Sequence, residues 1–237
     1  MSNDVASRLV ELTSRYGLTS DAGARLGALL DLVAAEPSAI TSVRDPAEGV
    51  DVHVADSLTA LGVDAVRDAG TIADLGAGGG FPGLALAIAL PRARVSLVES
   101  VGRKCAFLAR AIAELELANA EVVNARAEAW PEGLGANDVV TARALAPLSV
   151  LLEYAAPLLR AGGLLVAWKG AVDATEAQDG LAAADALGMG RPAPVPVRPF
   201  AGAREHALYL SSKVSLTPGG YPRRPGMARK RPIRAST

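Results

Sequence analysis

Few side chains in this sequence can bind a metal ion tightly or form a disulfide. The 237 residues contain a single cysteine, Cys105, and two histidines, His53 and His206. One cysteine cannot form an internal disulfide, and a structural zinc site requires about four Cys or His ligands. We therefore expect no metal site and no disulfide, and we interpret Cys105 as a packing residue.

Long hydrophobic runs are also missing, although half of the residues are hydrophobic. No stretch approaches the roughly 18 consecutive apolar residues of a membrane span, and the first residues lack the basic and then apolar layout of a secretion signal. These features favour a cytoplasmic protein without membrane contact. With 21% charged residues, the chain suits one large α/β domain or two small ones.

Acidic residues are absent from the C-terminal part. From His206 onward there are seven Lys or Arg residues and no Asp or Glu, whereas the preceding part carries all 25 acids. Such a basic end is typical of a segment that binds a polyanion, and a solvated, disordered terminus is the equally weighted alternative. Prolines alternate with basic pairs over residues 221–232, which predicts an extended segment rather than a helix.

The middle of the chain alternates short apolar runs with amphipathic stretches, as in parallel sheets with helical crossovers. A helical segment over residues 4–35 and a polar one containing His53 and Asp56 precede this part. His53 is expected to hydrogen-bond Asp56, to cap the ligand pocket or to serve the fold. A short loop at 200–205 predicts that the last two strands form a hairpin. We expect strands near 71–75, 94–98, 120–124, 138–142, 163–168, 193–199 and 206–213, and helices near 83–90, 102–117, 147–159 and 173–187.

A glycine-rich turn follows the first of these strands and predicts a ligand site. Gly76, Gly78 and Gly80 allow a sharp turn and a close backbone approach. Phe81 stands where a dinucleotide motif has its third glycine, and no Gly-Lys-Ser/Thr follows, which disfavours a dinucleotide and a nucleoside triphosphate. Asp74, two residues before Gly76, is expected to meet the ammonium group of an amino-acid ligand. The pattern suits S-adenosylmethionine.

Acidic residues after the next two strands extend this prediction. Glu99 ends the second strand, where a carboxylate can accept hydrogen bonds from a ribose diol, and the alternative is an ordinary surface carboxylate. After the third strand, the backbone of Ala127 and the side chain of Glu128 are candidates for contacting adenine.

Taken together, the motifs resemble a known family, the bacterial small-subunit rRNA guanine N7-methyltransferases called RsmG or GidB. The combination of Phe81-Pro82-Gly83, Arg143-Ala144 and Lys169-Gly170 is the most specific part. The matching segments are residues 40–46, 53, 56–57, 74–83, 102–104, 107–108, 126–128, 141–144, 169–170, 204–206 and 221–232.

The resemblance implies a class I (Rossmann-like) methyltransferase with a seven-stranded, mostly parallel sheet. It implies methyl transfer from S-adenosylmethionine to ring nitrogen 7 of a guanine in the 530 loop of 16S rRNA, on the small ribosomal subunit. The cofactor contacts carried over are Gly76, Phe81, Ala127, Glu128 and Arg143. We expect a helical N-terminal extension over 1–65, a core over 66–215, a basic tail over 216–237, and a monomer.

The residues agree with this chemistry. Guanine nitrogen 7 carries a lone pair and no proton, so its methylation needs alignment but no general base. The fourth strand ends Val140-Thr141-Ala142-Arg143-Ala144, without the Asn/Asp-Pro-Pro-aromatic loop of amine methyltransferases. Arg143, Arg126, Lys169 and Arg204 are candidates for gripping phosphates and the guanine oxygen, and each has the alternative of a surface ion pair.

Two other functions stay open. One is a class I methyltransferase with another substrate, and the other is an inactive protein that binds S-adenosylmethionine and assists ribosome assembly. We expect removal of residues 221–237 to weaken the salt dependence of RNA binding and to leave S-adenosylmethionine binding unchanged.

Overall fold

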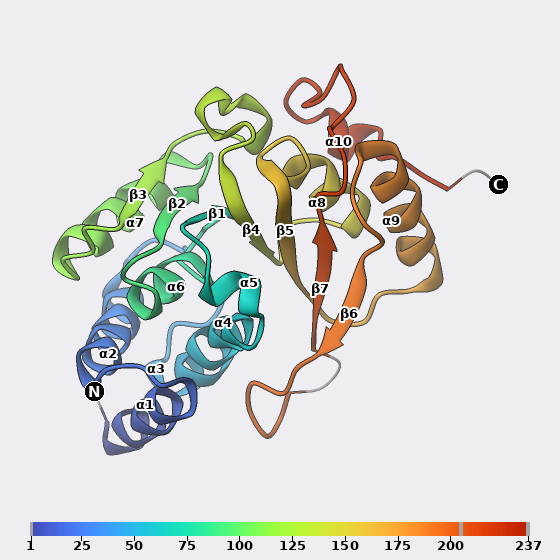
Figure 1. Ribbon diagram of the computed structural model, residues 1–237. Helices are drawn as coiled ribbons and strands as arrows, with labels where there is room; N and C mark the ends of the chain where they lie inside the picture. Colours follow the sequence, from blue (N-terminus) through green and yellow to red (C-terminus); the bar gives the residue numbers. More distant parts are fainter. Residues whose placement is uncertain (1, 204–205, 236–237) are drawn as a thin grey trace.

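The structure, a computed structural model, describes residues 2–203 and 206–235. Its centre is a seven-stranded sheet with the order β3-β2-β1-β4-β5-β7-β6 (Figure 1). β7 runs antiparallel to both of its neighbours, and β1 to β5 are mutually parallel. The strands are β1 Thr71–Leu75, β2 Arg94–Val98, β3 Ala120–Val123, β4 Asn137–Arg143, β5 Leu159–Lys169, β6 Ala193–Pro196 and β7 Ala207–Ser212. The expected mostly parallel sheet with a terminal hairpin is confirmed.

Helices cover both faces of this sheet (Figure 1). The helices are α1 Asn3–Tyr16, α2 Ser20–Ala35, α3 Pro46–Gly49, α4 Asp56–Leu58, α5 Asp64–Arg67, α6 Gly83–Ala89, α7 Gly102–Glu114, α8 Leu148–Ala155, α9 Ala174–Leu187 and α10 Met227–Lys230. Between α3 and α4 lies a π-helical segment, Val50–Ala55. Single 3-10 turns occupy Thr59–Gly62, Ala127–Ala129 and Pro131–Gly133. None of the helices in the described ranges is both long enough and apolar enough to span a membrane.

The N-terminal helices share one hydrophobic core with the sheet. Leu12 and Leu26, from α1 and α2, are fully buried in the same cluster as Ile72 and Leu97 of the sheet. The ends of α1 follow from its sequence, because the Ser2 hydroxyl caps its first turn and Gly17 ends it at a φ of +64°. The extension is therefore packed on the α6 side of the sheet.

A second core covers the opposite face. Ala73, Leu75 and Val98 of the sheet pack there against α8 and α9. Side chains alternate between the two faces of a strand, so Ile72 belongs to the first core and Ala73 to the second. The same alternation decides the position of Asp74, discussed below.

Several boundaries differ from the sequence-based expectation, by up to four residues. β5 begins at Leu159 instead of 163, and α8 ends at Ala155 instead of 159, because Pro157 follows the helix end. β6 is shorter than expected, since only Ala193–Pro196 pairs with β7.

The C-terminal segment is neither fully extended nor free of the core. Its expected extended backbone is wrong at α10, because residues 226–231 contain no proline and allow one helical turn. Ala228 is buried against the α8–α9 core, with Tyr221 and Ile233 packed beside it. The disordered alternative is therefore excluded for the described residues of this segment.

Candidate active site

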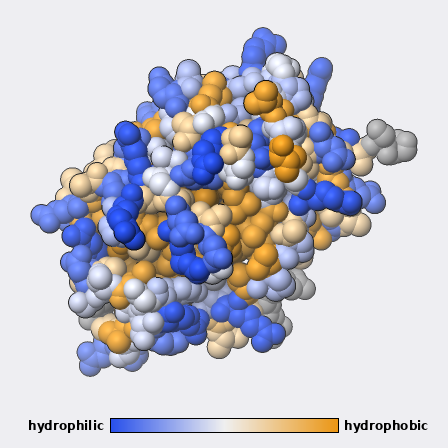
Figure 2. All heavy atoms as spheres, in the orientation of Figure 1, coloured by the Kyte–Doolittle hydropathy of each residue, from blue (hydrophilic) through white to orange (hydrophobic). Residues whose placement is uncertain are grey.

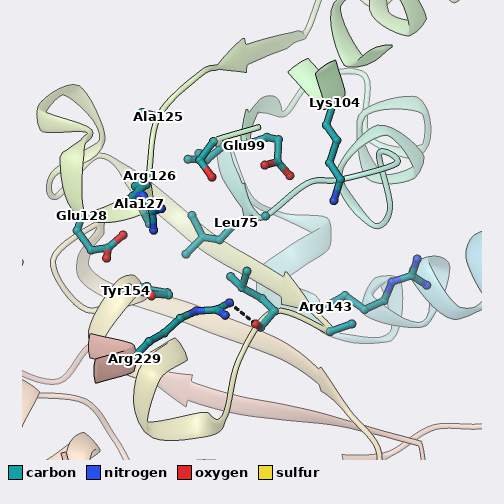
Figure 3. Close-up of a pocket in the computed structure, with 15 residues that line it drawn as sticks. Leu75, Glu99, Lys104, Ala125, Arg126, Ala127, Glu128, Arg143, Tyr154 and Arg229 are labelled. Atoms are coloured by element: carbon teal, nitrogen blue, oxygen red, sulfur yellow. Dashed lines mark hydrogen bonds between the residues drawn. The ribbon is translucent and has the colours of Figure 1, made fainter. Parts of the chain in front are cut away.

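A cavity of about 510 Å³ opens at the carboxyl ends of the parallel strands (Figure 3). This edge is where open α/β sheets bind ligands, and the volume lies within the usual range for small-molecule sites. We call it the large cavity. It is lined by Leu75, Gly76, Val98, Glu99, Ser100, Lys104, Ala125, Arg126, Ala127, Glu128, Arg143, Ala144, Leu145, Tyr154 and Arg229.

Five of the nine expected cofactor residues line this cavity: Gly76, Glu99, Ala127, Glu128 and Arg143. They come from the ends of β1, β2 and β4 and from the loop after β3. Figure 3 shows Glu128 and Arg143 at opposite ends of the cavity. The other four, Asp74, Gly78, Gly80 and Phe81, do not line it.

Glu99 joins the two loops that border the cavity. Its carboxylate accepts hydrogen bonds from the Gly78 N–H at 3.1 Å and from the Val101 N–H at 2.8 Å. The side chain is buried. Because each carboxylate oxygen has two acceptor sites, one remains on each oxygen for a ligand hydroxyl.

The glycines of the turn are required for different reasons. Gly76 has a φ of +68°, and a Cβ atom there would lie 2.7 Å from Cδ1 of Leu145, another residue of the wall. Gly80 has a φ of +89°, and its Cβ would lie 2.4 Å from Cδ1 of Leu84 in α6. Gly76 therefore shapes the cavity itself, whereas Gly80 permits packing beneath it.

Asp74 does not line the cavity, and its expected contact with a ligand ammonium group stays a prediction. The side chain is fully buried. Its carboxylate accepts hydrogen bonds from the Gly83 N–H at 3.0 Å and from the Thr141 hydroxyl at 2.7 Å. Because side chains alternate along a strand, the Asp74 side chain points toward α6, and its two hydrogen bonds connect the N-terminus of α6 to β4. Burial raises the pKa of Asp74 to about 7, against the hydrogen bonds from Thr141 and Gly83.

Phe81 lies behind Arg143 and supports the histidine beside it. Its ring stacks on His53 with 4.7 Å between ring centroids. The guanidinium carbon of Arg143 lies 5.9 Å from the Phe81 ring centroid. Phe81 therefore backs the arginine and does not line the cavity.

Arg143 is held by three acceptors from the segment before β1. Its guanidinium donates to the Asp56 carboxylate at 2.9 Å and to the Val52 carbonyl at 2.8 Å. A third contact, of 3.2 Å, joins it to Nδ1 of His53. His53 thus contacts Arg143, and Asp56 contacts Arg143 and His206.

The protonation state of His53 follows from its partners. Burial lowers the pKa of His53, which favours the neutral ring at neutral pH. Nδ1 then accepts from Arg143, and Nε2 donates to the Val43 carbonyl at 3.0 Å. The arginine is consequently oriented by a neutral ring on one side and a carboxylate on the other.

A second cavity of about 280 Å³ adjoins the large one at Arg143 and Ala144, and we call it the small cavity. Its other lining residues include Asp56, Trp168, Lys169 and His206. Lys169 forms a 2.5 Å ion pair with Glu176 of α9. Figure 2 shows a hollow with apolar lining near the centre of the molecular face, bordered by hydrophilic side chains.

The four expected RNA-gripping residues are distributed between the two cavities. Arg143 lines both, Arg126 is an exposed residue of the large cavity, and Lys169 lines the small one. Arg204 lies outside the described residues. The structure thus brings Arg143 and Lys169 together around one cavity.

Among the residues of the large cavity that sequence reasoning missed are Lys104, Tyr154 and Arg229. Lys104 was part of a recognised motif without a role, and Tyr154 sits in a helix that reads as core. Arg229 belongs to the basic tail, and only the fold-back of this segment brings it to the cavity. We therefore expect donor binding to depend on this segment, in contrast to the expectation from the sequence alone.

Sheet order, helices on both faces and a cavity at the strand ends define the class I methyltransferase fold. Solved structures agree: a SAM-dependent O-methyltransferase from Thermotoga maritima superposes with a TM-score of 0.55 at 18% identity, over 80% of this chain and 72% of that one. An antibiotic-resistance methyltransferase, Kmr, gives a TM-score of 0.50 at 22% identity, over 65% and 92%. Likeness at this identity concerns the fold alone.

The sequence relationship is closer and identifies the family. Residues 28–190 match the family model GidB, rRNA small subunit methyltransferase G. The protein of that name from Rubrobacter xylanophilus is 43% identical over 201 residues, covering 82% of this chain and 77% of the relative. The Chloroflexus aggregans protein is 35% identical over 240 residues, covering 98% and 100%. The chain belongs to the rRNA small subunit methyltransferase G family.

Proposed function

We propose that this protein transfers the methyl group of S-adenosylmethionine to ring nitrogen 7 of a guanine in the 530 loop of 16S rRNA. The observation that carries the proposal is the pair of adjoining cavities that share Arg143. A methyl donor in the large cavity and a base in the small one would meet beside this side chain.

The large cavity fits an adenosyl amino acid in its chemistry. Glu99 has free acceptor capacity for the ribose hydroxyls, and Glu128 with the backbone of Ala127 lies where the base of the nucleoside would follow. Gly76 keeps the floor open, since a Cβ there would displace Leu145. These residues would hold the donor across the ends of β1 and β2.

The small cavity offers groups suited to the Hoogsteen edge of guanine. Arginine and lysine are the usual donors to guanine O6 and N7, and nitrogen 7 itself must stay free for the methyl group. Arg143 and Lys169 both line this cavity. Their role in this proposal is to hold O6 and the neighbouring phosphates, which leaves the nitrogen 7 lone pair directed toward the large cavity.

The proposed reaction requires positioning and no proton transfer. When bound, S-adenosylmethionine supplies the methyl group, whose bond to sulfur breaks as the lone pair of nitrogen 7 forms the new bond. Arg143 is a permanent cation that cannot serve as a base, and Asp56 is engaged with it and with His206. The residues at the junction are thus suited to alignment, which is all that this nitrogen demands.

The exposed cations of the tail supply an RNA-binding surface in this proposal. Arg224, Arg229, Lys230, Arg231 and Arg234 are exposed on the segment that borders the large cavity. Phosphate contacts by such residues make affinity strongly dependent on salt concentration. The proposed partner is therefore the small ribosomal subunit or its 16S rRNA, bound by a single copy of this chain.

The test is methyl transfer from a tritiated donor to deproteinised 16S rRNA and to intact 30S particles, both from cells that lack this modification. We expect 7-methylguanosine in the digested product, mapped by mass spectrometry to the 530 loop. If the label appears on another nucleoside, the proposed target is wrong. If the protein binds the donor but transfers no methyl group to either substrate, the binding-protein alternative is supported.

A further inference from the structure

The C-terminal segment is fastened to the core at the edge of the large cavity. Arg223 donates two hydrogen bonds to the carboxylate of Glu153 in α8, one of them at 2.6 Å, and Glu153 is almost completely buried. Ala228 of α10 is buried in the α8–α9 core. A buried, bidentate ion pair and an apolar anchor hold the segment in one place.

Two residues of this segment reach the cavity. The Gly226 N–H donates a 2.8 Å hydrogen bond to the carboxylate of Glu128. Arg229 lines the cavity, and its guanidinium donates to the Leu145 carbonyl at 2.6 Å (Figure 3). The tail thus supplies part of the cavity wall and orients a carboxylate within it.

Arg229, Tyr154 and Glu128 form a cluster at this wall. Burial raises the pKa of the Tyr154 hydroxyl, the charge of Glu128 raises it further, and the Arg229 guanidinium opposes the shift. Arg229 donates to the Leu145 carbonyl and lies within hydrogen-bond range of the Tyr154 hydroxyl, and a guanidinium carries five N–H groups. Its remaining donors are available at the cavity surface.

We propose that Arg229 contacts the nucleoside moiety of the methyl donor, and that the C-terminal segment is a necessary wall of the donor site. This inference rests on the proposed function. Arg229 and Tyr154 stand on the Glu128 side of the cavity, opposite Arg143 (Figure 3). Adenine presents ring-nitrogen acceptors and a π face, and a guanidinium can satisfy both.

The test compares Arg229→Ala with Lys230→Ala, which removes an exposed cation one residue away. Dissociation constants are measured by calorimetry without RNA, for S-adenosylhomocysteine and for 5′-methylthioadenosine, which lacks the amino-acid end. We expect Arg229→Ala to weaken both ligands by about tenfold or more, as for loss of a charged hydrogen bond, and by similar factors. Lys230→Ala should bind both as the wild type does.

Each outcome decides a separate point. If Arg229→Ala binds both ligands with unchanged affinity, the inference is wrong. If only S-adenosylhomocysteine binds more weakly, Arg229 contacts the amino-acid end of the donor, and the assignment to the nucleoside is wrong. If the wild type binds neither ligand, the proposed function fails instead.

Hydrogen exchange distinguishes a direct contact from loss of the tail's attachment. We expect the amides of Met227 and Lys230, which donate to the Arg224 and Gly226 carbonyls, to stay protected in Arg229→Ala, because Arg223 and Ala228 still anchor the segment. Fast exchange there, together with weaker binding, would mean that Arg229 only tethers the tail, which contradicts the proposed contact. A chain ending at Gly220 should lose at least as much affinity as Arg229→Ala.

Discussion

Replacing Asp56 with asparagine should uncouple Arg143 from the segment that orients it. The two side chains form a 2.9 Å ion pair, with 8% of the Asp56 side chain and 17% of the Arg143 side chain exposed. Breaking a buried pair from one side costs about 3–5 kcal/mol. Arg143 borders two cavities and keeps Val52 and His53 as partners, so we expect a smaller loss, about 2 kcal/mol of unfolding free energy.

The assay is urea unfolding of four proteins: wild type, Asp56→Asn, Arg143→Gln and the double variant. The cycle should give a coupling energy of about 1–2 kcal/mol, and methyl transfer by Asp56→Asn should fall at least about tenfold in kcat/KM. Asp64→Asn is the matched control, because its ion pair with Arg67 is exposed and should change stability by less than about 0.5 kcal/mol. A coupling energy below about 0.5 kcal/mol would refute the proposed orientation of Arg143 by Asp56.

Four other changes test separate parts of the structure. Burial raises the pKa of Asp74 to about 7, so between about pH 4 and 7 the folded state holds a proton that the unfolded state has released. The contribution of Asp74 to the free energy of unfolding therefore falls as the pH rises toward 7. Replacing Asp74 with asparagine should flatten the curve of Tm against pH over this range. Gly80→Ala places a Cβ 2.4 Å from Leu84 at a φ of +89° and should lower stability by about 1–3 kcal/mol, seen in thermal unfolding. Lys169→Gln should weaken methyl transfer to rRNA while the donor's dissociation constant stays unchanged, whereas a parallel loss of donor affinity would contradict its assignment to the small cavity. Deleting residues 221–237 should reduce the slope of log affinity for rRNA against log salt concentration, and equal slopes would remove the tail from the RNA-binding surface.

Much of the fold follows from local sequence signals. Apolar runs that alternate with amphipathic stretches predict the order of elements, and the short connection before β7 predicts the terminal hairpin. The boundaries near 155–163 were less accurate, because β5 extends beyond its apolar run through Arg160 and the glycines that follow. Pairing of that first part with β4 is a tertiary effect.

The candidate site was predictable where a residue follows the end of a strand. Gly76, Glu99 and Arg143 stand at the carboxyl ends of β1, β2 and β4, and all three line the large cavity. For Asp74, strand alternation predicts the direction of the side chain, because Ile72 faces the α6 side and Asp74 must face the same side. The position of Asp74 within β1, and not its proximity to the glycines, therefore determines where its side chain lies.

Arg229 could not be predicted in the same way. Its placement depends on Arg223 meeting Glu153 and on Ala228 entering a core formed about 70 residues earlier in the chain. Charge pattern alone suggests a surface for a polyanion, and the exposed cations of the segment retain that interpretation. Arg229 is exposed as well, but only the folded structure reveals its contacts with the Leu145 carbonyl and with Tyr154.

The N-terminal extension contributes to the site through Arg143. Val52, His53 and Asp56 all come from residues 50–58, where a π-helical turn runs into α4, and such turns are frequent at functional sites. Because a neutral histidine, a carbonyl and a carboxylate each accept from the same guanidinium, its plane is set before any ligand arrives. A reaction that depends on alignment alone gains most from such preorganisation, since no reorganisation is then required when donor and base meet. The proposed reaction therefore accounts for the close packing of this helical segment against the carboxyl edge of the sheet.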